Sequence, residues 1–193
     1  MNGFILEALA EHLRLVEYLR ANCGVIEAIA RRVGDAIAAG HRVYLIGNGG
    51  SAADAQHIAA ELLGRFKLER AALPAIALTT DTSTLTSVGN DYGFGQVFTR
   101  QVQGLVRAGD VLWALSTSGN SENIIDAVRL AREAGAIIVG MTGRTGGKLR
   151  PLCHECLCVD HESSDRIQEI HQVAYHLICE AVERRFAASA QPA

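Results

Sequence analysis

Five short, almost wholly apolar runs constrain the fold of this chain more than any other feature of its sequence. Helical patterns separate several of them, over residues 52–64, 93–107 and 121–134. Strands that are apolar along their whole length are buried on both faces, which is typical of a parallel sheet covered by helices. The sequence therefore predicts an α/β fold, a doubly wound sheet of five parallel strands with right-handed crossovers. The apolar runs are 43–46, 75–78, 111–115, 137–141 and 157–159.

Helical patterns also flank the predicted sheet. Two amphipathic helices are expected over 3–22 and 25–38, the second ending near Gly40, and a long helix over about 164–186. Ser163, Ser164 or Asp165 would cap the last helix. The pattern leaves two placements open for the N-terminal pair, on the domain's own sheet or against another subunit. We expect one domain over 1–193, composed of a helical pair (1–40), a sheet core (41–160) and a C-terminal helix (161–187).

Composition excludes several partners. The formal net charge is −3 and aromatic residues make up only 5% of the chain, so neither a basic surface nor stacking platforms favour nucleic acid. No run of about 18 apolar residues is present, and residues 1–10 do not have the pattern of a signal peptide. We therefore expect a cytoplasmic protein that neither spans a membrane nor binds one.

The five cysteines are expected to be reduced thiols, because their number is odd and the domain is large enough to fold without disulfides. Cys153, Cys156 and Cys158 include a Cys-x-x-Cys pattern that is found in structural zinc sites. The second ligand pair of such a site is missing, so we expect these side chains to act as small buried hydrophobic residues.

Two polar loops follow predicted strands and open predicted helices. In an open parallel sheet, ligands bind at this carboxyl edge. Hydroxyl groups and free backbone N–H groups at a helix N-terminus suit a phosphate dianion, although Ser121 alone could also be a simple N-cap. Four hydroxyls in six residues favour phosphate binding. The loop residues are Asn48, Gly49, Gly50 and Ser51 in the first loop, and Ser116, Thr117, Ser118 and Ser121 in the second.

The glycine-rich first loop, which begins at Gly47, does not match a nucleotide-binding motif. No Gly-Lys-Ser/Thr follows Gly47, and the third glycine of the dinucleotide fingerprint is absent. A third polar segment, Asn90-Asp91-Tyr92-Gly93, is expected as a loop before the helix over 93–107. Its two interpretations, contact with sugar hydroxyls or a simple turn, are equally supported by the sequence.

Two pairs of side chains have the spacing of a reactive site. His57 and Glu61 are four residues apart and share one helix face, while Gln168 and His176 are eight apart on the last helix. Together they would offer a divalent ion nitrogen and oxygen ligands and leave room for substrate oxygens. An exposed helix face or a satisfied histidine would equally explain either pair alone.

Four motifs resemble the sugar isomerase domain family, and in particular its phosphoheptose isomerase branch. They cover the chain in the order and with the separations of that family. The motifs are residues 47–57 (Gly-Asn-Gly-Gly-Ser-Ala-Ala-Asp-Ala-Gln-His), 89–93 (Gly-Asn-Asp-Tyr-Gly), 116–121 (Ser-Thr-Ser-Gly-Asn-Ser) and 165–169 (Asp-Arg-Ile-Gln-Glu).

The resemblance implies a flavodoxin-like sheet without a bound nucleotide, a homotetramer, and conversion of sedoheptulose 7-phosphate to D-glycero-D-manno-heptose 7-phosphate. Glu61 and His176 would be the catalytic acid/base pair. Zinc would be held by His57, Glu61, Gln168 and His176. The sugar phosphate would contact Asn48, Gly49, Gly50, Ser51, Glu61, Asn90, Asp91, Ser116, Thr117, Ser118, Ser121 and Gln168.

Two alternatives come from the same family. One is a non-catalytic tetramer that binds a replication initiator protein and lacks the catalytic residues. The other is a sugar-phosphate sensor fused to a DNA-binding domain, for which this chain has no residues left. The presence of both Glu61 and His176 favours the enzyme.

Overall fold

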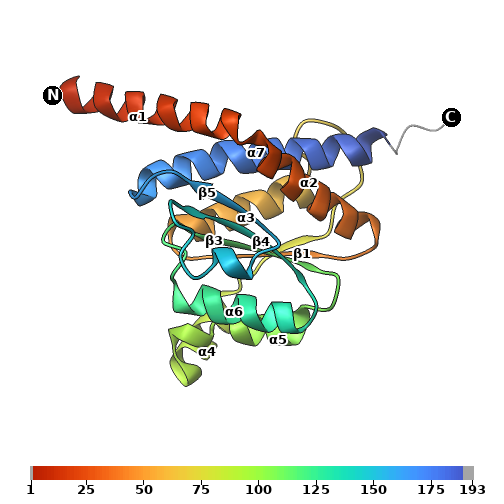
Figure 1. Cartoon of the computed structure of the whole chain (residues 1–193). Helices are drawn as coiled ribbons and strands as arrows, with labels where there is room; N and C mark the ends of the chain where they lie inside the picture. Colours follow the sequence, from red (N-terminus) through yellow and green to blue (C-terminus); the bar gives the residue numbers. More distant parts are fainter. Residues whose placement is uncertain (1, 189–193) are drawn as a thin grey trace.

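The computed structural model describes residues 2–188, built around one sheet of five parallel strands (Figure 1). The strands lie in the order β2-β1-β3-β4-β5, the order of a flavodoxin-like doubly wound sheet. The predicted α/β class is thus confirmed. Met1 and residues 189–193, which the single-domain expectation includes, lie outside the described residues. The strands are β1 (Val43–Gly47), β2 (Ala75–Ala77), β3 (Val111–Ser116), β4 (Ile137–Gly143) and β5 (Glu155–Val159).

Helices cover both faces of the sheet (Figure 1). The layer of α1, α2, α3 and α7 lies on one face, and the layer of α4, α5 and α6 on the other. Within residues 2–188, no helix has the length and apolar character needed to cross a bilayer. The helices are α1 (Asn2–Ala21), α2 (Cys23–Ala38), α3 (Gly50–Leu63), α4 (Thr82–Tyr92), α5 (Thr99–Leu105), α6 (Glu122–Glu133) and α7 (Ser164–Ala188), with short 3₁₀ turns at Phe94–Gln96 and Arg150–Leu152.

The central strands are apolar throughout because each of their faces meets a hydrophobic core. Along β1, Val43 and Leu45 pack in the core beneath α2, α3 and α7, while Tyr44 and Ile46 pack in the core beneath α5 and α6. Every residue of β1 and β3 is buried. A strand with one solvated face would alternate apolar and polar residues, so the continuous pattern was a reliable signal.

The N-terminal helices pack mainly on the chain's own sheet. Helix α2 contacts α7 and β5, and the second half of α1 buries Leu15 and Leu19 in the same core. The first half of α1 projects beyond the rest of the chain (Figure 1). The first of the two predicted placements therefore holds for α2 and for the end of α1.

The segment between β2 and β3 differs from its prediction. Residues 82–92 form α4, where no helix was predicted, and the helix predicted over 93–107 is only a 3₁₀ turn followed by α5. Helix α4 has no fully buried residue, and only Leu85 and Val88 pack against the core, so its apolar stripe is weak. Its start is fixed by Asp81, whose carboxylate accepts bonds from the Thr84 N–H at 3.1 Å and the Thr84 hydroxyl at 2.6 Å.

One buried histidine makes the stability of this fold depend on pH. His171 of α7 is fully buried, with Nε2 3.2 Å from the Thr142 carbonyl oxygen, and among the described residues its Nδ1 has no hydrogen-bond partner. Burial lowers the pKa of His171 to about 4. Below pH 6.5 the unfolded chain gains a proton here that the folded chain excludes.

We expect the contribution of His171 to the free energy of unfolding to be complete above pH 6.5. It should then decline by about 1.4 kcal/mol per pH unit as the pH falls toward 4. Urea unfolding at pH 7.5, 6 and 5 measures this slope, and His171→Gln should flatten it by that amount. Equal slopes in the two proteins would contradict the assignment.

Candidate active site

The two loops with predicted phosphate contacts are neighbours in space. β1 pairs with β3, so the residues that follow these two strands meet at the carboxyl edge of the sheet, where the strand order reverses. Asn48 of the first loop and Asn123 of α6 exchange two amide hydrogen bonds of 2.9 Å each. This reciprocal pair joins the loops into one surface.

Glycines allow the close approach of chain segments in both loops. A Cβ on Gly47 would lie 2.4 Å from the Ser51 carbonyl oxygen. Gly119 has a φ of +63°, and a Cβ there would lie 2.2 Å from the Gly146 carbonyl oxygen. In both cases the obstacle is backbone, which cannot rotate away, so no other residue fits without moving the loop.

The hydroxyls of the second loop do not cap α6, and their contact with a phosphate stays a prediction. Ser121 occupies the N-cap position of α6 but makes no side-chain capping bond. Its Oγ lies 3.3 Å from Oγ of the buried Ser116. Thr117 contacts the hydroxyl of Ser164 at the start of α7, at 3.0 Å, and the hydroxyl of the exposed Ser118 accepts a bond from the Asn120 N–H. The alternative of a simple N-cap therefore has no support in the geometry.

The second cluster lies between α3 and α7. Nε2 of His57 lies 3.0 Å from Glu61 Oε1 and 3.5 Å from Nε2 of His176. One ligand atom from each of the three residues lies within 4.8 Å of the others. The i, i+4 spacing on α3 had indicated the first contact, and the packing of α7 against α3 makes the second.

Tyr175 contacts the other side of the His57 ring. Its hydroxyl donates to Asp54 Oδ1 at 3.4 Å and lies 3.3 Å from Nδ1 of His57. In the tautomer that carries its proton on Nδ1, His57 donates to the Tyr175 oxygen and offers the Nε2 lone pair to a metal ion, whereas in the other tautomer Nε2 donates to Glu61 Oε1.

This donor set fits a divalent metal ion. Two imidazole nitrogens and a carboxylate oxygen converge. Within residues 2–188 it is the only group of at least three His, Cys, Asp or Glu residues with this proximity. Nitrogen and oxygen ligands in this number suit zinc and several other divalent ions.

His176 lies in a partly apolar setting. The ring of Phe66 stacks on it, with centroids 5.5 Å apart and an interplanar angle of 13°. Burial, together with the neighbouring His57, lowers the pKa of His176, and Glu61 only partly opposes this. The imidazole is therefore neutral at neutral pH, as both a ligand and a proton acceptor must be.

Gln168, the predicted fourth ligand, lies at the loop end of the contact between α3 and α7. A Cβ on Gly50 would come within 2.6 Å of its amide nitrogen. Eight residues of helix separate Gln168 from His176, about 12 Å along the axis. Gln168 therefore contacts the first glycine loop, and its role as a ligand stays a prediction.

Asn90 and Asp91 lie in the last turn of α4, not in a loop. Both are exposed, and the Asn90 amide donates to the Asp91 carboxylate at 2.8 Å. Their contact with the sugar stays a prediction.

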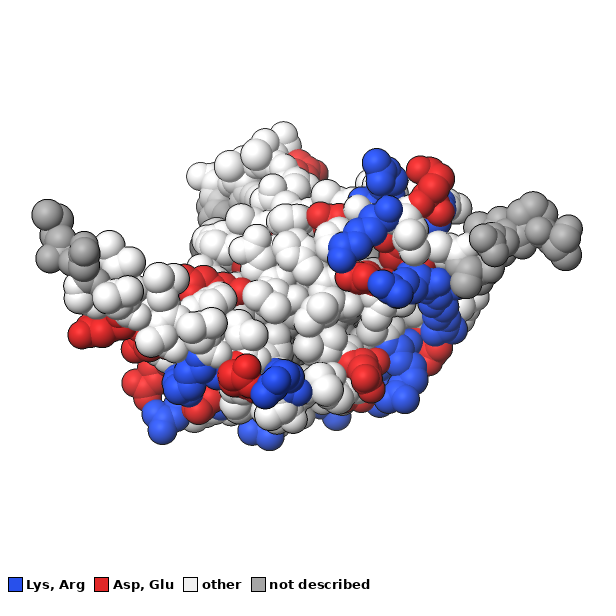
Figure 2. Space-filling model, turned by 90° about the horizontal axis from the view of Figure 1, so that it is seen from above, with Lys and Arg blue, Asp and Glu red and all other residues white. Residues whose placement is uncertain are grey.

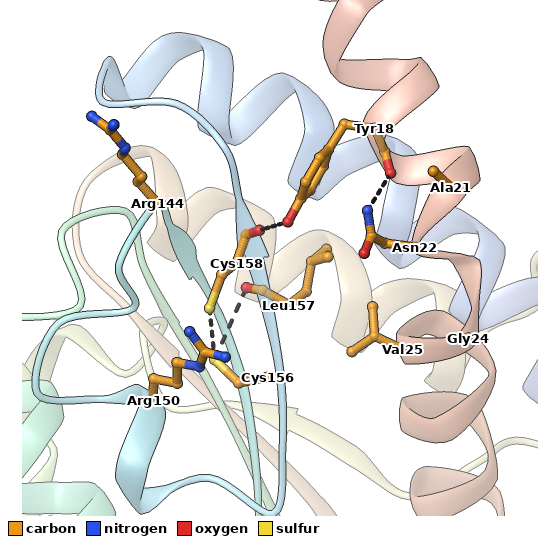
Figure 3. A pocket seen from close by; sticks show the side chains of 10 residues that line it. All are labelled: Tyr18, Ala21, Asn22, Gly24, Val25, Arg144, Arg150, Cys156, Leu157 and Cys158. Atoms are coloured by element: carbon orange, nitrogen blue, oxygen red, sulfur yellow. Dashed lines mark hydrogen bonds between the residues drawn. The ribbon is translucent and has the colours of Figure 1, made fainter.

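Cys156 and Cys158 lie away from the cluster between α3 and α7, beside a cavity of about 440 Å³ between β5 and the α1–α2 junction (Figure 3). The sulfurs of Cys156 and Cys158 are 3.8 Å apart. A hydrogen bond with Cys153, together with burial, raises the pKa of Cys156 to about 12, so it stays a thiol. Nδ1 of the neighbouring His154 accepts the Ile138 N–H. The expectation of small buried hydrophobic residues holds only in part, because Cys153, Cys156 and Cys158 are each partly exposed.

Comparison with known proteins assigns the family. The SIS domain model matches residues 9–143. A phosphoheptose isomerase of Akkermansia muciniphila is 52% identical over 166 residues, which is 86% of this chain and 88% of that protein. The chain belongs to the phosphoheptose isomerase family. Solved phosphoheptose isomerases from Neisseria gonorrhoeae and Francisella tularensis superpose with TM-scores of 0.85 and 0.87, at 40% and 34% identity, each over 95% of this chain and 96% of theirs.

In this member of the phosphoheptose isomerase family, three residues of the site were not predicted from the sequence. Asp54 lies one turn before His57, Tyr175 directly precedes His176, and Phe66 follows α3. The only indication of them in the sequence was that they lie close to the predicted site residues His57, Glu61 and His176. Because their roles depend on contacts between α3, α7 and the following loop, no spacing rule would have selected them.

The hydroxyl loop supports a binding prediction. Ser121→Ala and Ser118→Ala are each expected to raise KM for a sugar phosphate about 10-fold or more, since a hydrogen bond to a charged group contributes about 1.5–3 kcal/mol. The rate at saturation should change less, because the phosphate lies away from the reacting carbons. Steady-state kinetics measures both, with Ser83→Ala on the exposed face of α4 as the matched control. An unchanged KM in both variants would place the phosphate elsewhere.

Proposed function

We propose that the protein is an aldose–ketose isomerase that converts sedoheptulose 7-phosphate to D-glycero-D-manno-heptose 7-phosphate. The observation that supports this most strongly is the convergence of Glu61 and His176 in a chain whose strand-end loops carry hydroxyls and free N–H groups. The first suits proton transfer and the second suits phosphate binding. The reaction would be the first step of ADP- or GDP-heptose synthesis for lipopolysaccharide and related glycans.

The reaction moves hydrogen between two neighbouring carbons. In our proposal the carboxylate of Glu61 removes a proton from C1 of the ketose, the C1=C2 double bond forms, and the C2 oxygen takes a proton to give an enediol. Glu61 then returns a proton to C2 as the carbonyl forms at C1. His176, neutral at neutral pH, exchanges the protons of the two oxygens.

The two oxygens of Glu61 have different surroundings. Oε1 faces His57 at 3.0 Å. Within residues 2–188 the structure gives Oε2 no hydrogen bond, so this oxygen has a free lone pair for a carbon-bound proton. A ligand role for one oxygen and a base role for the other are therefore compatible in one side chain.

We propose zinc as the cofactor, one ion per site, held by His57, Glu61 and His176 with Gln168 as the fourth ligand. The convergence of the first three donors supports it. Such an ion supplies a Lewis acid that polarises a substrate carbonyl.

We also propose that the protein works as a cytoplasmic homotetramer. The projecting half of α1 carries five large apolar side chains between 46% and 67% exposed. Figure 2 looks onto the α1, α2 and α7 face, whose middle is largely uncharged while charged residues gather at its edges. An apolar area of this kind favours burial against further copies of the chain. The five residues are Phe4, Ile5, Leu6, Leu9 and Leu13.

The alternative of a non-catalytic module that binds a replication initiator is less well supported. Such a module has no need for His57 in contact with both Glu61 and His176.

Incubation of the protein with sedoheptulose 7-phosphate and Zn²⁺ tests the proposal directly. We expect the aldose, D-glycero-D-manno-heptose 7-phosphate, to accumulate to equilibrium, as followed by NMR. Fructose 6-phosphate serves as the comparison substrate. If no product formed from the heptulose with zinc present, the binding-module alternative would be favoured.

A further inference from the structure

A fully buried carboxylate on α7 has no part in the mechanism above. Glu183 accepts three backbone hydrogen bonds, from the N–H groups of Phe66 (2.7 Å), Lys67 (2.6 Å) and Leu68 (3.0 Å). These residues belong to the loop that leaves α3. One side chain of α7 thus fixes the course of that loop.

Arg70 completes the arrangement and is almost as deeply buried. Its Nε lies 3.4 Å from Glu183 Oε1. Its Nη2 donates to the Glu61 carbonyl oxygen at 2.8 Å, and its Nη1 donates to the carbonyl oxygens of Gly64 and Ala71 at 3.3 and 2.9 Å. The last carbonyls of a helix have no partner within it. Arg70 therefore supplies a hydrogen-bond donor to a carbonyl at the end of α3. That carbonyl belongs to Glu61, whose side chain is the proposed base.

The Arg70–Glu183 ion pair is connected to both Glu61 and His176. Glu61 is held through its own backbone oxygen. His176 precedes Glu183 by seven residues, or two turns, so both lie on nearly the same face of α7. Phe66, whose N–H is bonded to Glu183, stacks on the His176 ring. The ion pair thus connects the end of α3, the Phe66 loop and α7 around the site.

We propose that Arg70 and Glu183 are positioning residues that set the distance between Glu61 and His176, and with it the affinity of the site for a divalent cation. This inference rests on the roles proposed above for Glu61 and His176. Stability alone does not account for the pair, because buried ion pairs are often replaceable by apolar residues without loss. The fork of Arg70 instead matches specific carbonyl groups, those of Glu61 and Gly64 at the end of α3 and that of Ala71 in the following loop.

Two variants separate positioning from stability. Arg70→Lys keeps a positive charge beside Glu183 but loses the fork that bonds the α3 carbonyls. Glu183→Gln keeps the shape but removes the charge and one acceptor. The matched control is Glu180→Gln, one turn earlier on α7, whose carboxylate contacts the side chains of Lys67 and Arg184 instead of the backbone.

Zinc affinity, measured on the full chain by competition with a chelating dye, is the principal readout. We expect Arg70→Lys and Glu183→Gln to weaken Zn²⁺ binding about 10–100-fold, with a similar fall in kcat and an unchanged KM. Glu180→Gln should leave all three at wild-type values. Folded variants with lower thermal stability but zinc affinity and kcat within twofold of wild type would overturn the proposal.

A measurement on the unaltered protein applies even if both variants fail to fold. Coupling between two sites is reciprocal, so zinc binding must also stabilise the loop bonds. Saturation with Zn²⁺ is expected to slow amide hydrogen exchange at residues 66–68 at least 10-fold. Unchanged exchange there would contradict the coupling. Both zinc readouts hold whether or not the chain isomerises a heptose phosphate, so they fail independently of the proposed function.

Discussion

Replacement of Glu61 by glutamine is expected to lower isomerisation by about 10²–10⁴-fold, the contribution typical of a general acid/base group. The amide has nearly the shape of the carboxylate but cannot accept a proton from carbon. Exchange of solvent deuterium into the substrate at C1 should be lost together with product formation. Both are measured by NMR in D₂O with sedoheptulose 7-phosphate.

The matched control for this variant is Glu69→Gln, because Glu69 lies in the loop beyond α3 and its side chain is 91% exposed. It should retain full activity. Circular dichroism and thermal unfolding should show that Glu61→Gln remains folded. If a folded Glu61→Gln protein still exchanged deuterium at the wild-type rate, another residue would have to be the base.

Removal of divalent ions is expected to reduce turnover by about 10²-fold or more. Polarisation of a carbonyl by a bound ion contributes several kcal/mol, and each 1.36 kcal/mol is a factor of ten in rate. Treatment with a chelator followed by gel filtration prepares the apo-protein. Addition of one equivalent of Zn²⁺ per chain should restore activity.

Variants of His176 and His57 test whether the loss of turnover on metal removal arises at this site. His176→Ala and His57→Ala should bind Zn²⁺ far more weakly and should not be rescued by one equivalent. His41→Ala is the control, because His41 precedes β1 at the opposite edge of the sheet and lies beside Asp110. Full turnover by protein shown to contain less than about a tenth of an ion per chain would exclude a catalytic role for the metal.

The sheet was predictable because burial on both faces leaves a continuous apolar pattern in each central strand, as in Val111–Ser116. Helix α4 was not, since it has no fully buried residue and depends on the Asp81 cap. Local patterns thus reveal elements that carry the core. They do not reveal elements that rest on its surface.

The residues of the site also fall into those that the sequence indicated and those that it did not. His57 and Glu61 were found from sequence because one helix turn fixes their distance. The sequence did not show that the loop at 48–51 lies beside the loop at 116–121, because only the pairing of β1 with β3 brings the two loops together. Asp54, Tyr175 and the Arg70–Glu183 pair had no pattern of their own.

The sequence by itself determined the fold class, the two ligand loops and the chemistry of the side chains, because these depend on residue type and on spacing within one element. Only the tertiary structure decided which groups act together. The contact of His176 with His57, the contact of Tyr175 with His57 and the bonds that Glu183 accepts from residues 66–68 all join α7 to α3 or to the loop that follows it. More than 100 residues separate these partners along the chain, and a local pattern carries no information about contacts over that distance.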